Sequence, residues 1–199
     1  GITVCNVPAY CTAEVADHAL ALLLACLRVI PRGEQAVRGK PYRRLALGAK
    51  RRLEGATIGI IGLGRIGSTV ARRLAGWEPR LLAYDPYITS QRAQQFGAEL
   101  VDWATLLTES DVVTVHCPLT SETHHMLDAA ALGRLRPGAI LINTARGPIV
   151  DETALVHALT SGQLWAAGLD VTEQEPLSAD SPLLALDNVI LTPHVAAYS

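Results

Sequence analysis

The stretch "TIGIIGLGRIGSTVARRLAG", residues 57–76, passes from a short apolar run through three glycines into an amphipathic segment. Gly62, Gly64 and Gly67 follow the spacing G-x-G-x-x-G. The spacing alone is weak evidence, because glycines also occur in plain turns. Its setting, with a strand-like run before it and a helix-like pattern after it, is typical of a turn that binds the pyrophosphate of a dinucleotide.

Each glycine has a separate physical task in such a turn. Gly62 permits the tight bend, Gly64 lets the backbone approach the pyrophosphate, and Gly67 lets the helix pack closely on the strand. The N–H groups and the dipole at the start of the helix favour the anion. Asp85 closes the next apolar run. We expect its carboxylate to accept hydrogen bonds from the ribose hydroxyls of the adenosine half and to repel a 2′-phosphate, which predicts NAD rather than NADP.

The rest of the chain from Thr57 alternates short apolar runs with amphipathic stretches. The strand-like runs are "TIGIIGLG", "RLLAYDP", "DVVTVHCP", "AILINTA", "LWAAGLDV" and "NVILTP", and the helix-like ones are "RIGSTVARRLAG", "SQRAQQFG", "DAAALGRLRPG" and "DETALVHALTSG". Strands that are apolar throughout have to be covered on both faces, which indicates a parallel sheet between two layers of helices. The predicted fold class is therefore α/β, a doubly wound, Rossmann-like parallel sheet in a single nucleotide-binding domain.

A different pattern precedes this alternation. Thr12 is a candidate N-cap, and the stretch "AEVADHALALLLACLRVI" that follows it is apolar on nearly all sides. We expect a largely buried helix that ends at Pro31. An irregular basic segment is expected from there to Arg52.

The basic segment, residues 28–52, contains nine of the 17 lysines and arginines and a single acidic residue, Glu34. Such a stretch could contact nucleic acid. It has Tyr42 as its only aromatic residue, however, and carries no nucleic-acid motif. A solvated or subunit-contacting arm is therefore the preferred interpretation, and no nucleic-acid partner is expected.

The composition is that of an ordinary globular protein, with 49% hydrophobic and 18% charged residues and a net charge of -2. The longest apolar stretch, Ala19 to Leu27, is far shorter than the roughly 20 residues of a membrane span. No basic region precedes a cleavage-like site. The four cysteines form no C-x-x-C pair, which favours reduced, buried thiols over disulfides or a zinc site. We therefore expect a cytoplasmic protein without membrane contact.

The candidate site residues lie directly after the apolar runs, because ligands of doubly wound sheets bind beyond the carboxyl ends of the strands. The residues found there are Cys117, Pro118, Thr144, Ala145, Arg146, Asp170 and His194. Arg146, Glu175 and His194 follow three different strands. Together they could provide an anchor for a carboxylate, a base and a group that orients the base.

Each of these three residues also has an ordinary structural explanation. Arg146 could pair with Asp151 or Glu152, Glu175 could be a solvated loop residue, and His194 could be a hydrogen-bonded histidine at a strand end. The sequence alone leaves these alternatives open.

Four ordered motifs, "GIIGLGRIG", "NTARGPIVDE", "GLDVTEQEP" and "TPHVA", resemble the nucleotide-binding domain of the D-isomer-specific 2-hydroxyacid dehydrogenases. The resemblance spans nearly the whole chain. Within that family, the stretches "VCNVPAYCTAEVADHALALLL", "YDPYI", "HCPLTSETHH" and "HVAAYS" look most like the branch of the C-terminal-binding proteins and their bacterial relatives. The implied activity is an NAD-dependent oxidoreductase of the EC 1.1.1 type, transferring a hydride between NAD(H) and a small 2-hydroxy or 2-oxo acid.

The resemblance also implies a role for each site residue. Arg146 would hold the substrate carboxylate, His194 would take the hydroxyl proton as the hydride leaves, and Glu175 would hold the imidazole. Arg65 and Ile66 would offer backbone groups to the pyrophosphate with help from Thr123, and Asp170 would bind the nicotinamide amide. The residues expected to bind NAD are Gly62, Gly64, Arg65, Ile66, Gly67, Asp85, Cys117, Pro118, Thr123, Thr144, Ala145, Arg146, Asp170 and His194.

Family members are around half again as long and have a substrate domain built from both termini. We therefore expect residues 1–8 to be a remnant strand of a missing substrate domain and residues 9–199 to be the NAD-binding domain. Within it, residues 9–52 would form the helix and a basic dimerisation arm, and residues 53–199 the Rossmann core. Without the substrate domain, this fragment is expected to be inactive or weakly active.

Two functional hypotheses follow. The leading one is the NAD domain of a dehydrogenase, forming a homodimer through residues 10–50, as the resemblance implies. The alternative is an NAD-sensing dimeric interaction module resembling the corepressors, with little or no turnover. The corepressor branch has a tryptophan where this chain has Ala197, so its substrate preference does not transfer.

No metal site is expected, because the adjacent His124 and His125 do not direct both rings at one ion and no carboxylate cluster accompanies them.

Overall fold

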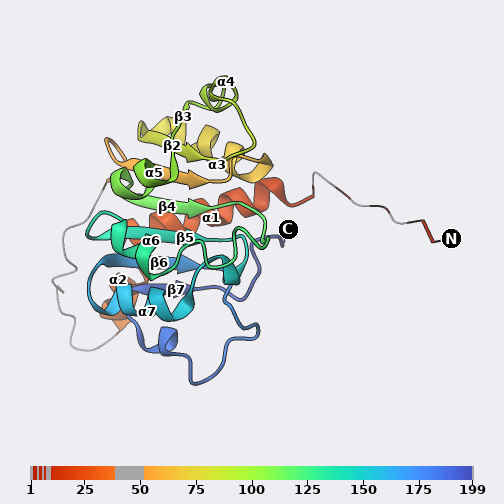
Figure 1. Ribbon diagram of the computed structural model, residues 1–199. Helices are drawn as coiled ribbons and strands as arrows, with labels where there is room; N and C mark the ends of the chain where they lie inside the picture. The colour runs from red at the N-terminus through yellow and green to blue at the C-terminus, as the bar shows by residue number, and fades with distance from the viewer. Residues whose placement is uncertain (1, 4, 6, 8–9, 39–51, 199) are drawn as a thin grey trace.

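The structure is a computed structural model that describes residues 2, 3, 5, 7, 10–38 and 52–198. Its centre is a parallel sheet with the strand order β3-β2-β1-β4-β5-β6-β7 (Figure 1). The strands are β1 Thr57–Ile61, β2 Arg80–Tyr84, β3 Ala98–Leu100, β4 Val112–Val115, β5 Ala139–Asn143, β6 Leu164–Leu169 and β7 Val189–Leu191. Every neighbouring pair is parallel. This is the doubly wound α/β fold expected from the alternating apolar runs.

Helices cover both faces of the sheet. They are α1 Thr12–Arg28, α2 Ile30–Arg38, α3 Arg65–Leu74, α4 Ser90–Gln94, α5 Trp103–Glu109, α6 Ala129–Arg134 and α7 Glu152–Thr160. Short 3-10 turns are η1 Ala75–Trp77, η2 Gly147–Ile149 and η3 Pro182–Ala185. One apolar core joins α1 and α3 to the sheet, and a second joins α5, α6 and α7 to its other face. Burial on both sides explains why strands such as β5 contain only apolar residues up to Asn143.

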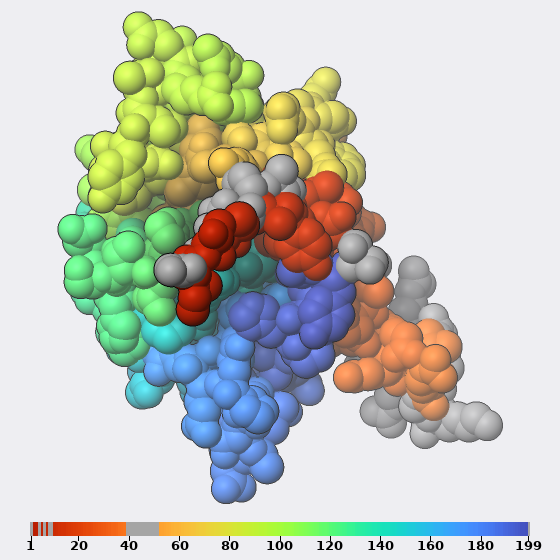
Figure 2. All heavy atoms as spheres, turned by 90° about the vertical axis from the view of Figure 1, so that its right-hand side faces the viewer, coloured from red at the N-terminus to blue at the C-terminus, as the bar shows by residue number. Residues whose placement is uncertain are grey.

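The strand order reverses between β1 and β4, because β2 and β3 lie on one side of β1 and the later strands lie on the other. Loops that leave two such strands diverge and leave a crevice at the carboxyl edge of the sheet. Figure 2 shows this edge of the molecule, where the red N-terminal segment runs between the green residues after β4 and the dark-blue C-terminal residues. The topology therefore fixes where a ligand of this domain would bind.

The start of α1 differs slightly from the prediction. The helix begins at Thr12 itself, and the cap position is Cys11, with a left-handed φ of 56° and no side-chain capping bond. The predicted N-cap is thus wrong by one residue.

The segment after α1 also differs from the prediction. The chain turns at Val29, where φ is again 56°, and then forms α2 in place of the first part of the expected irregular segment. Pro31 lies in the first turn of α2. Proline is compatible with that position, because the first N–H groups of a helix have no partner within the helix. Pro31 was predicted to end the first helix, but it lies at the start of the second one.

Other predicted features fall partly or wholly outside the described residues. Residues 39–51, the greater part of the expected basic arm, are not described. Of the strand expected over residues 1–8, only residues 2, 3, 5 and 7 are described, and these four are not in a strand.

Among the cysteines, Cys26 is buried as expected and Cys5 is exposed, contrary to the prediction. None of the described helices is both long enough and apolar enough to span a bilayer.

Candidate active site

The glycine turn connects β1 to α3 and has little space for side chains. Gly62 has a φ of +86°, and a Cβ there would lie 2.8 Å from the backbone nitrogen of Cys117. A Cβ on Gly67 would lie 2.1 Å from the carbonyl oxygen of Gly62. A Cβ on Gly64, in contrast, would meet open space, and Gly64 provides no side-chain cap for α3. Two glycines thus make the close packing possible, and the third leaves the N-terminus of α3 open to an anion such as a pyrophosphate.

Asp85 lies directly after β2 and is fixed against the glycine turn. Its Oδ2 accepts a hydrogen bond from the backbone N–H of Leu63 at 2.9 Å, and its Oδ1 accepts one from the N–H of Tyr87 at 3.0 Å. Each oxygen keeps a second lone pair for a ligand hydroxyl. The carboxylate lines a cavity of about 220 Å³ that also contains Gly64 and Thr123. This arrangement fits the ribose of an adenosine group.

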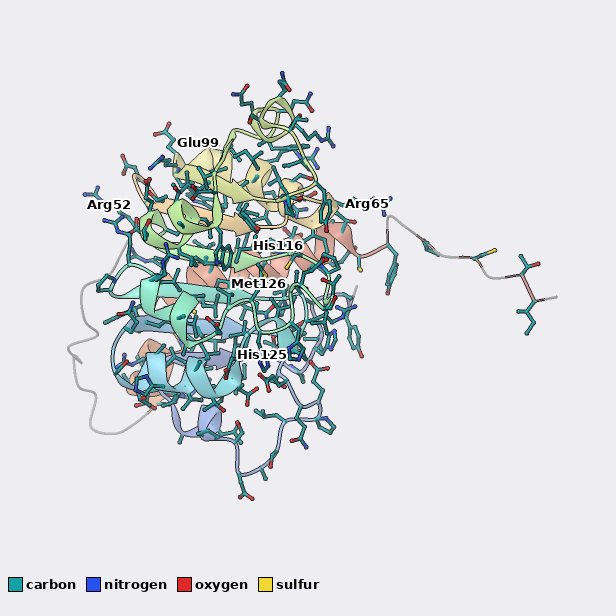
Figure 3. All side chains as sticks on the ribbon, viewed as in Figure 1. Arg52, Arg65, Glu99, His116, His125 and Met126 are labelled. Atoms are coloured by element: carbon teal, nitrogen blue, oxygen red, sulfur yellow. The ribbon has the colours of Figure 1, made fainter. Side chains whose placement is uncertain are left out.

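A second cavity, of about 600 Å³, lies at the carboxyl ends of β4, β5 and β6. Of the predicted site residues, Ile66, Cys117, Pro118, Thr144, Ala145, Arg146, Asp170 and His194 line it. His116, Cys117 and Pro118 line both cavities, so the two adjoin. Together they form one crevice that runs from the glycine turn to the carboxyl ends of β4, β5 and β6. In Figure 3, His116 lies inside the molecule, and Arg65 lies at the edge opposite to Arg52.

Thr144 places an unpaired polar atom at the second cavity. Its Oγ1 is buried and has no hydrogen-bond partner among the described residues. A buried hydroxyl without a partner costs free energy, and the groups that remain unsatisfied in native proteins are often those that a ligand contacts. The residues of this cavity therefore fit the second half of the cofactor.

His194, which lines this cavity, forms a hydrogen-bonded pair with Glu175, which lines an adjoining cavity of about 530 Å³ that His194 and Asp170 also line. The His194 Nδ1 lies 2.7 Å from the Glu175 Oε2, and the two side chains are 45% and 39% exposed. Glu175 is itself held, because its Oε1 accepts a hydrogen bond from the N–H of Thr172 at 3.2 Å. Since Nδ1 faces the carboxylate, Nε2 is the nitrogen that points away from it and can exchange a proton with a substrate.

Arg146 lies on a short turn that Asn143 closes. The buried Asn143 side chain donates from Nδ2 to the carbonyl of Arg146 at 2.9 Å and accepts from the N–H of Ala145 at 3.0 Å. The guanidinium is exposed, with one bond to the adjacent carbonyl of Ala145 at 2.6 Å. Next in the chain, a Cβ on Gly147 would lie 1.9 Å from the carbonyl oxygen of Thr172. This close packing keeps the turn of Arg146 beside the segment that carries Glu175.

The ion-pair explanation for Arg146 is not supported. Asp151 caps α7 by accepting from the N–H of Ala154, and Glu152 accepts from the N–H of Glu173. Within the described part of the chain, Arg146 forms no ion pair with a carboxylate. Its charge remains available for a ligand.

Asp170 is more deeply embedded than the sequence suggests. It is 1% exposed, and its carboxylate accepts from the Thr192 hydroxyl and from the N–H groups of Val195 and Ala196. Its Oδ2 retains one acceptor position for the predicted amide of a nicotinamide. The sequence interpretation did not identify Thr192 or Asn143 as site residues. Their signal was present, because both are polar residues at or just beyond the ends of apolar strands.

His116, a residue to which the family resemblance assigned no role, lies between the two cavities. Burial lowers the pKa of His116 to about 4 from its ordinary value of 6.5, so its ring is neutral near pH 7. Its Nε2 lies 2.9 Å from the Thr114 Oγ1. His125 is another histidine that was not assigned to the site. Its Nε2 lies 2.8 Å from the Glu173 Oε1, so it contacts the loop that carries Glu175.

Comparison with known proteins identifies the family. A sequence profile described as "D-isomer specific 2-hydroxyacid dehydrogenase, NAD binding domain" matches residues 20–196. The chain belongs to the D-isomer-specific 2-hydroxyacid dehydrogenase family. The matched region of that family is its NAD-binding domain, so the predicted family, fold and cofactor are confirmed.

Relatives within the 2-hydroxyacid dehydrogenase family include enzymes with different names. D-3-phosphoglycerate dehydrogenase of Archaeoglobus fulgidus is 48% identical over 198 residues, which cover 99% of this chain and 37% of that protein. Glyoxylate reductase of Korarchaeum cryptofilum is 44% identical over 204 residues, which cover 100% of this chain and 61% of that protein. This chain thus spans between about one third and three fifths of these two relatives.

Solved structures superpose closely on this chain. The TT0316 protein from Thermus thermophilus has a TM-score of 0.91 at 40% identity and covers 100% of this chain and 63% of that one. D-Lactate dehydrogenase from Aquifex aeolicus, complexed with NAD and lactic acid, has a TM-score of 0.88 at 36% identity. The match covers 97% of this chain and 62% of that one. The narrower likeness to the branch of the C-terminal-binding proteins stays a prediction.

Proposed function

We propose that this chain is the cofactor half of an NAD-dependent dehydrogenase that acts on small 2-hydroxy and 2-oxo acids. The observation that carries the proposal is the hydrogen bond of 2.7 Å between Glu175 and His194, because His194 lines the same cavity as Arg146. A proton-transfer pair beside a free guanidinium is suited to a substrate that has both a carboxylate and a hydroxyl.

Arg146 holds the substrate carboxylate in this proposal. Its exposed guanidinium can form two parallel hydrogen bonds to a carboxylate, and each charged bond contributes roughly 1.5 to 3 kcal/mol. The turn that Asn143 closes limits how far the arginine can swing. The hydroxyl carbon of the substrate is thereby placed at a fixed distance from the cofactor crevice.

His194 moves the proton. When bound, NAD supplies the hydride acceptor for oxidation, and NADH supplies the donor for reduction. The His194 Nε2 accepts the hydroxyl proton during oxidation and returns it to the carbonyl oxygen during reduction, a contribution of roughly 10² to 10⁴ in rate. Glu175 fixes the tautomer through Nδ1 and stabilises the imidazolium that forms.

The remaining cofactor residues bind and orient. The backbone at Gly64, Arg65 and Ile66 holds the pyrophosphate at the N-terminus of α3, with Thr123 beside it. Asp85 selects NAD, Thr144 contributes its unpaired hydroxyl, and the Asp170 Oδ2 accepts from the nicotinamide amide. The other predicted cofactor residues, Cys117, Pro118 and Ala145, form the apolar and backbone wall of the crevice.

The proposed assembly is a homodimer through residues 10–50, together with a substrate domain that supplies the rest of the substrate pocket. We further propose residues 9–199 as the cofactor domain and residues 1–8 as the end of a substrate-domain strand. The cytoplasmic location stays a prediction, as does the expectation that neither nucleic acid nor a membrane is a partner.

The test has two parts. NADH fluorescence titration of this chain should show saturable binding. In a protein that joins this chain to a substrate domain, small 2-oxo acids should be reduced with NADH, and His194→Ala should lower kcat at least about 10²-fold. His157→Ala is the matched control, because His157 is an exposed histidine on α7 and should leave kcat unchanged.

Two results would count against this function. Turnover that survives His194→Ala would show that another group moves the proton. Absence of turnover with NAD-dependent binding of a protein partner would favour the interaction module resembling the corepressors.

A further inference from the structure

A chain of polar contacts links α1 to the loop that carries His194. His18, on α1, has its Nε2 2.9 Å from the Thr192 Oγ1 and 3.4 Å from the Asp170 Oδ1. The His18 side chain is 22% exposed, and the Asp170 side chain is 0% exposed. His18 and Thr192 are 174 positions apart in the sequence, and the resemblance assigned no role to His18.

The direction of the hydrogen bonds in this chain follows from the acceptor at its end. The Thr192 Oγ1 lies 2.5 Å from the Asp170 Oδ1. An ionised carboxylate can only accept, so the threonine hydroxyl donates its single hydrogen to Asp170. The hydroxyl must then be the acceptor in its contact with His18. The His18 Nε2 therefore carries a hydrogen and donates it to Thr192.

Asp170 transmits this contact to the active-site loop. Its Oδ1 also accepts from the N–H of Val195 at 3.0 Å, and its Oδ2 accepts from the N–H of Ala196 at 2.9 Å. Its backbone carbonyl accepts from the N–H of His194 at 2.8 Å. One buried residue thus holds three consecutive amides of the loop.

The loop needs such support, because His194 has a left-handed φ of 54°. A residue with a side chain adopts this conformation at a cost, and it persists only where the surroundings hold it. A buried carboxylate likewise requires several donors to offset its lost hydration. His18 supplies the donor at the outer end of this network.

We propose that His18 is a positioning residue that acts through Thr192 and Asp170 to hold the His194 loop in its strained conformation. It touches neither the cofactor nor the substrate in this proposal. The consequence for catalysis rests on the proposed function, whereas the consequence for the loop does not. The two can therefore be tested separately.

The direct test is amide hydrogen exchange, measured by NMR on this chain. In His18→Ala, the amides of Val195 and Ala196 should exchange roughly tenfold faster than in the parent, relative to the amides of β4 and β5. His18→Gln should restore much of the protection, because a glutamine amide can donate from near the position of Nε2. His157→Ala, the exposed control, should change neither group of amides.

A double-variant cycle tests the route of the effect. Thr192→Val should also speed exchange of the two loop amides, and His18→Ala should add little in that background, because the shared contact has already been removed. A full additional effect would show that His18 does not act through Thr192. Thermal unfolding of each variant confirms that it is folded.

Two outcomes would overturn the proposal. In one, the exchange rates of the Val195 and Ala196 amides in His18→Ala lie within about twofold of the rates in the parent chain. In the other, the amides of β4 and β5 accelerate by the same factor as the loop, which would indicate general destabilisation.

NADH titration of the same variants separates this proposal from the proposed function. His18→Ala should weaken NADH binding several-fold if the loop is disordered at the cofactor crevice. Failure of the parent chain to bind NADH would contradict the proposed function, while the exchange data would still decide the role of His18.

Discussion

Asp85 illustrates how its surroundings fix a single side chain at a candidate site. Two backbone N–H groups fix its carboxylate at the end of β2, against the glycine turn. Its negative charge thus has a defined position in the crevice. The sequence predicted the position of this residue correctly, because an acidic residue at the end of the second strand is part of the dinucleotide pattern.

Asp85→Ala should abolish the preference for NADH over NADPH. The variant loses the acceptor for the ribose hydroxyls and the repulsion of a 2′-phosphate, so NADH binding weakens while NADPH binding is unchanged or improves. Fluorescence titration with both cofactors measures the ratio. Asp180→Ala, at an exposed loop position, is the control and should keep the preference. Equal affinity of the parent chain for the two cofactors would contradict the role of Asp85.

His116 should make the stability of the fold depend on acid pH. Burial lowers its pKa from 6.5 to about 4, so below pH 6.5 the unfolded chain binds a proton that the folded chain does not. Stability is therefore complete above pH 6.5 and falls as the pH decreases towards 4. The full loss is about 3 kcal/mol, at about 1.4 kcal/mol for each pH unit.

Urea unfolding of the cofactor-free chain at several pH values measures this effect. His116→Gln should lose less stability between pH 7 and pH 4.5 than the parent, because the titrating group is gone. His157→Gln removes an exposed histidine and should follow the parent curve. Parallel curves for the parent and His116→Gln would show that His116 does not carry this pH dependence.

At the scale of elements, the sequence predicted the parts that have a strong apolar pattern. The strands β1, β2, β4, β5, β6 and β7 and the helices α1, α3, α4, α6 and α7 were all expected. It missed β3 and α5, and also α2, which lies in the segment that was expected to be irregular. The strand β3 has three residues at the edge of the sheet, and α5 buries only two adjacent residues, Leu106 and Leu107, which give no clear helical period. Both depend on packing that a local pattern does not contain.

The contact between α1 and β6 allows a test of how closely these two elements pack. A Cβ on Gly168 would lie 2.9 Å from the Leu22 Cβ and 3.0 Å from the Ile142 Cδ1. Gly168→Ala should therefore destabilise the fold by about 1 to 3 kcal/mol, because the helix or the strand must shift. Gly76→Ala is the control, since a Cβ there meets open space. Denaturant unfolding that finds equal stabilities would contradict the close packing of α1 on β6.

At the scale of the whole molecule, the site is the product of the topology. Residues from β4, β5, β6 and β7, far apart in the sequence, meet at one edge because parallel strands end on the same side. This is why the sequence could predict that Arg146 and His194 line one cavity. It could not predict the supporting role of His18, because His18 meets Thr192 only through a hydrogen bond between segments 174 positions apart.

The proposed dimer makes a prediction at this scale. No residue of α2 is buried, and Ile30 and Val37 are 57% and 63% exposed. Their spacing of seven places both on one face of the helix. Light scattering should find a dimer that Val37→Glu converts to a monomer. Leu184→Glu, at an exposed apolar residue on η3, should leave the dimer intact. A monomer at high concentration would contradict the assembly.

A crystal structure of this chain with NADH and oxamate, an unreactive analogue of a 2-oxo acid, tests the proposed site most directly. We predict that the nicotinamide ring lies in the cavity between Thr144 and Asp170, with the oxamate carboxylate hydrogen-bonded to Arg146 and its carbonyl oxygen to the His194 Nε2. A dinucleotide bound away from the glycine turn, or an oxamate that contacts neither Arg146 nor His194, would contradict the proposed function.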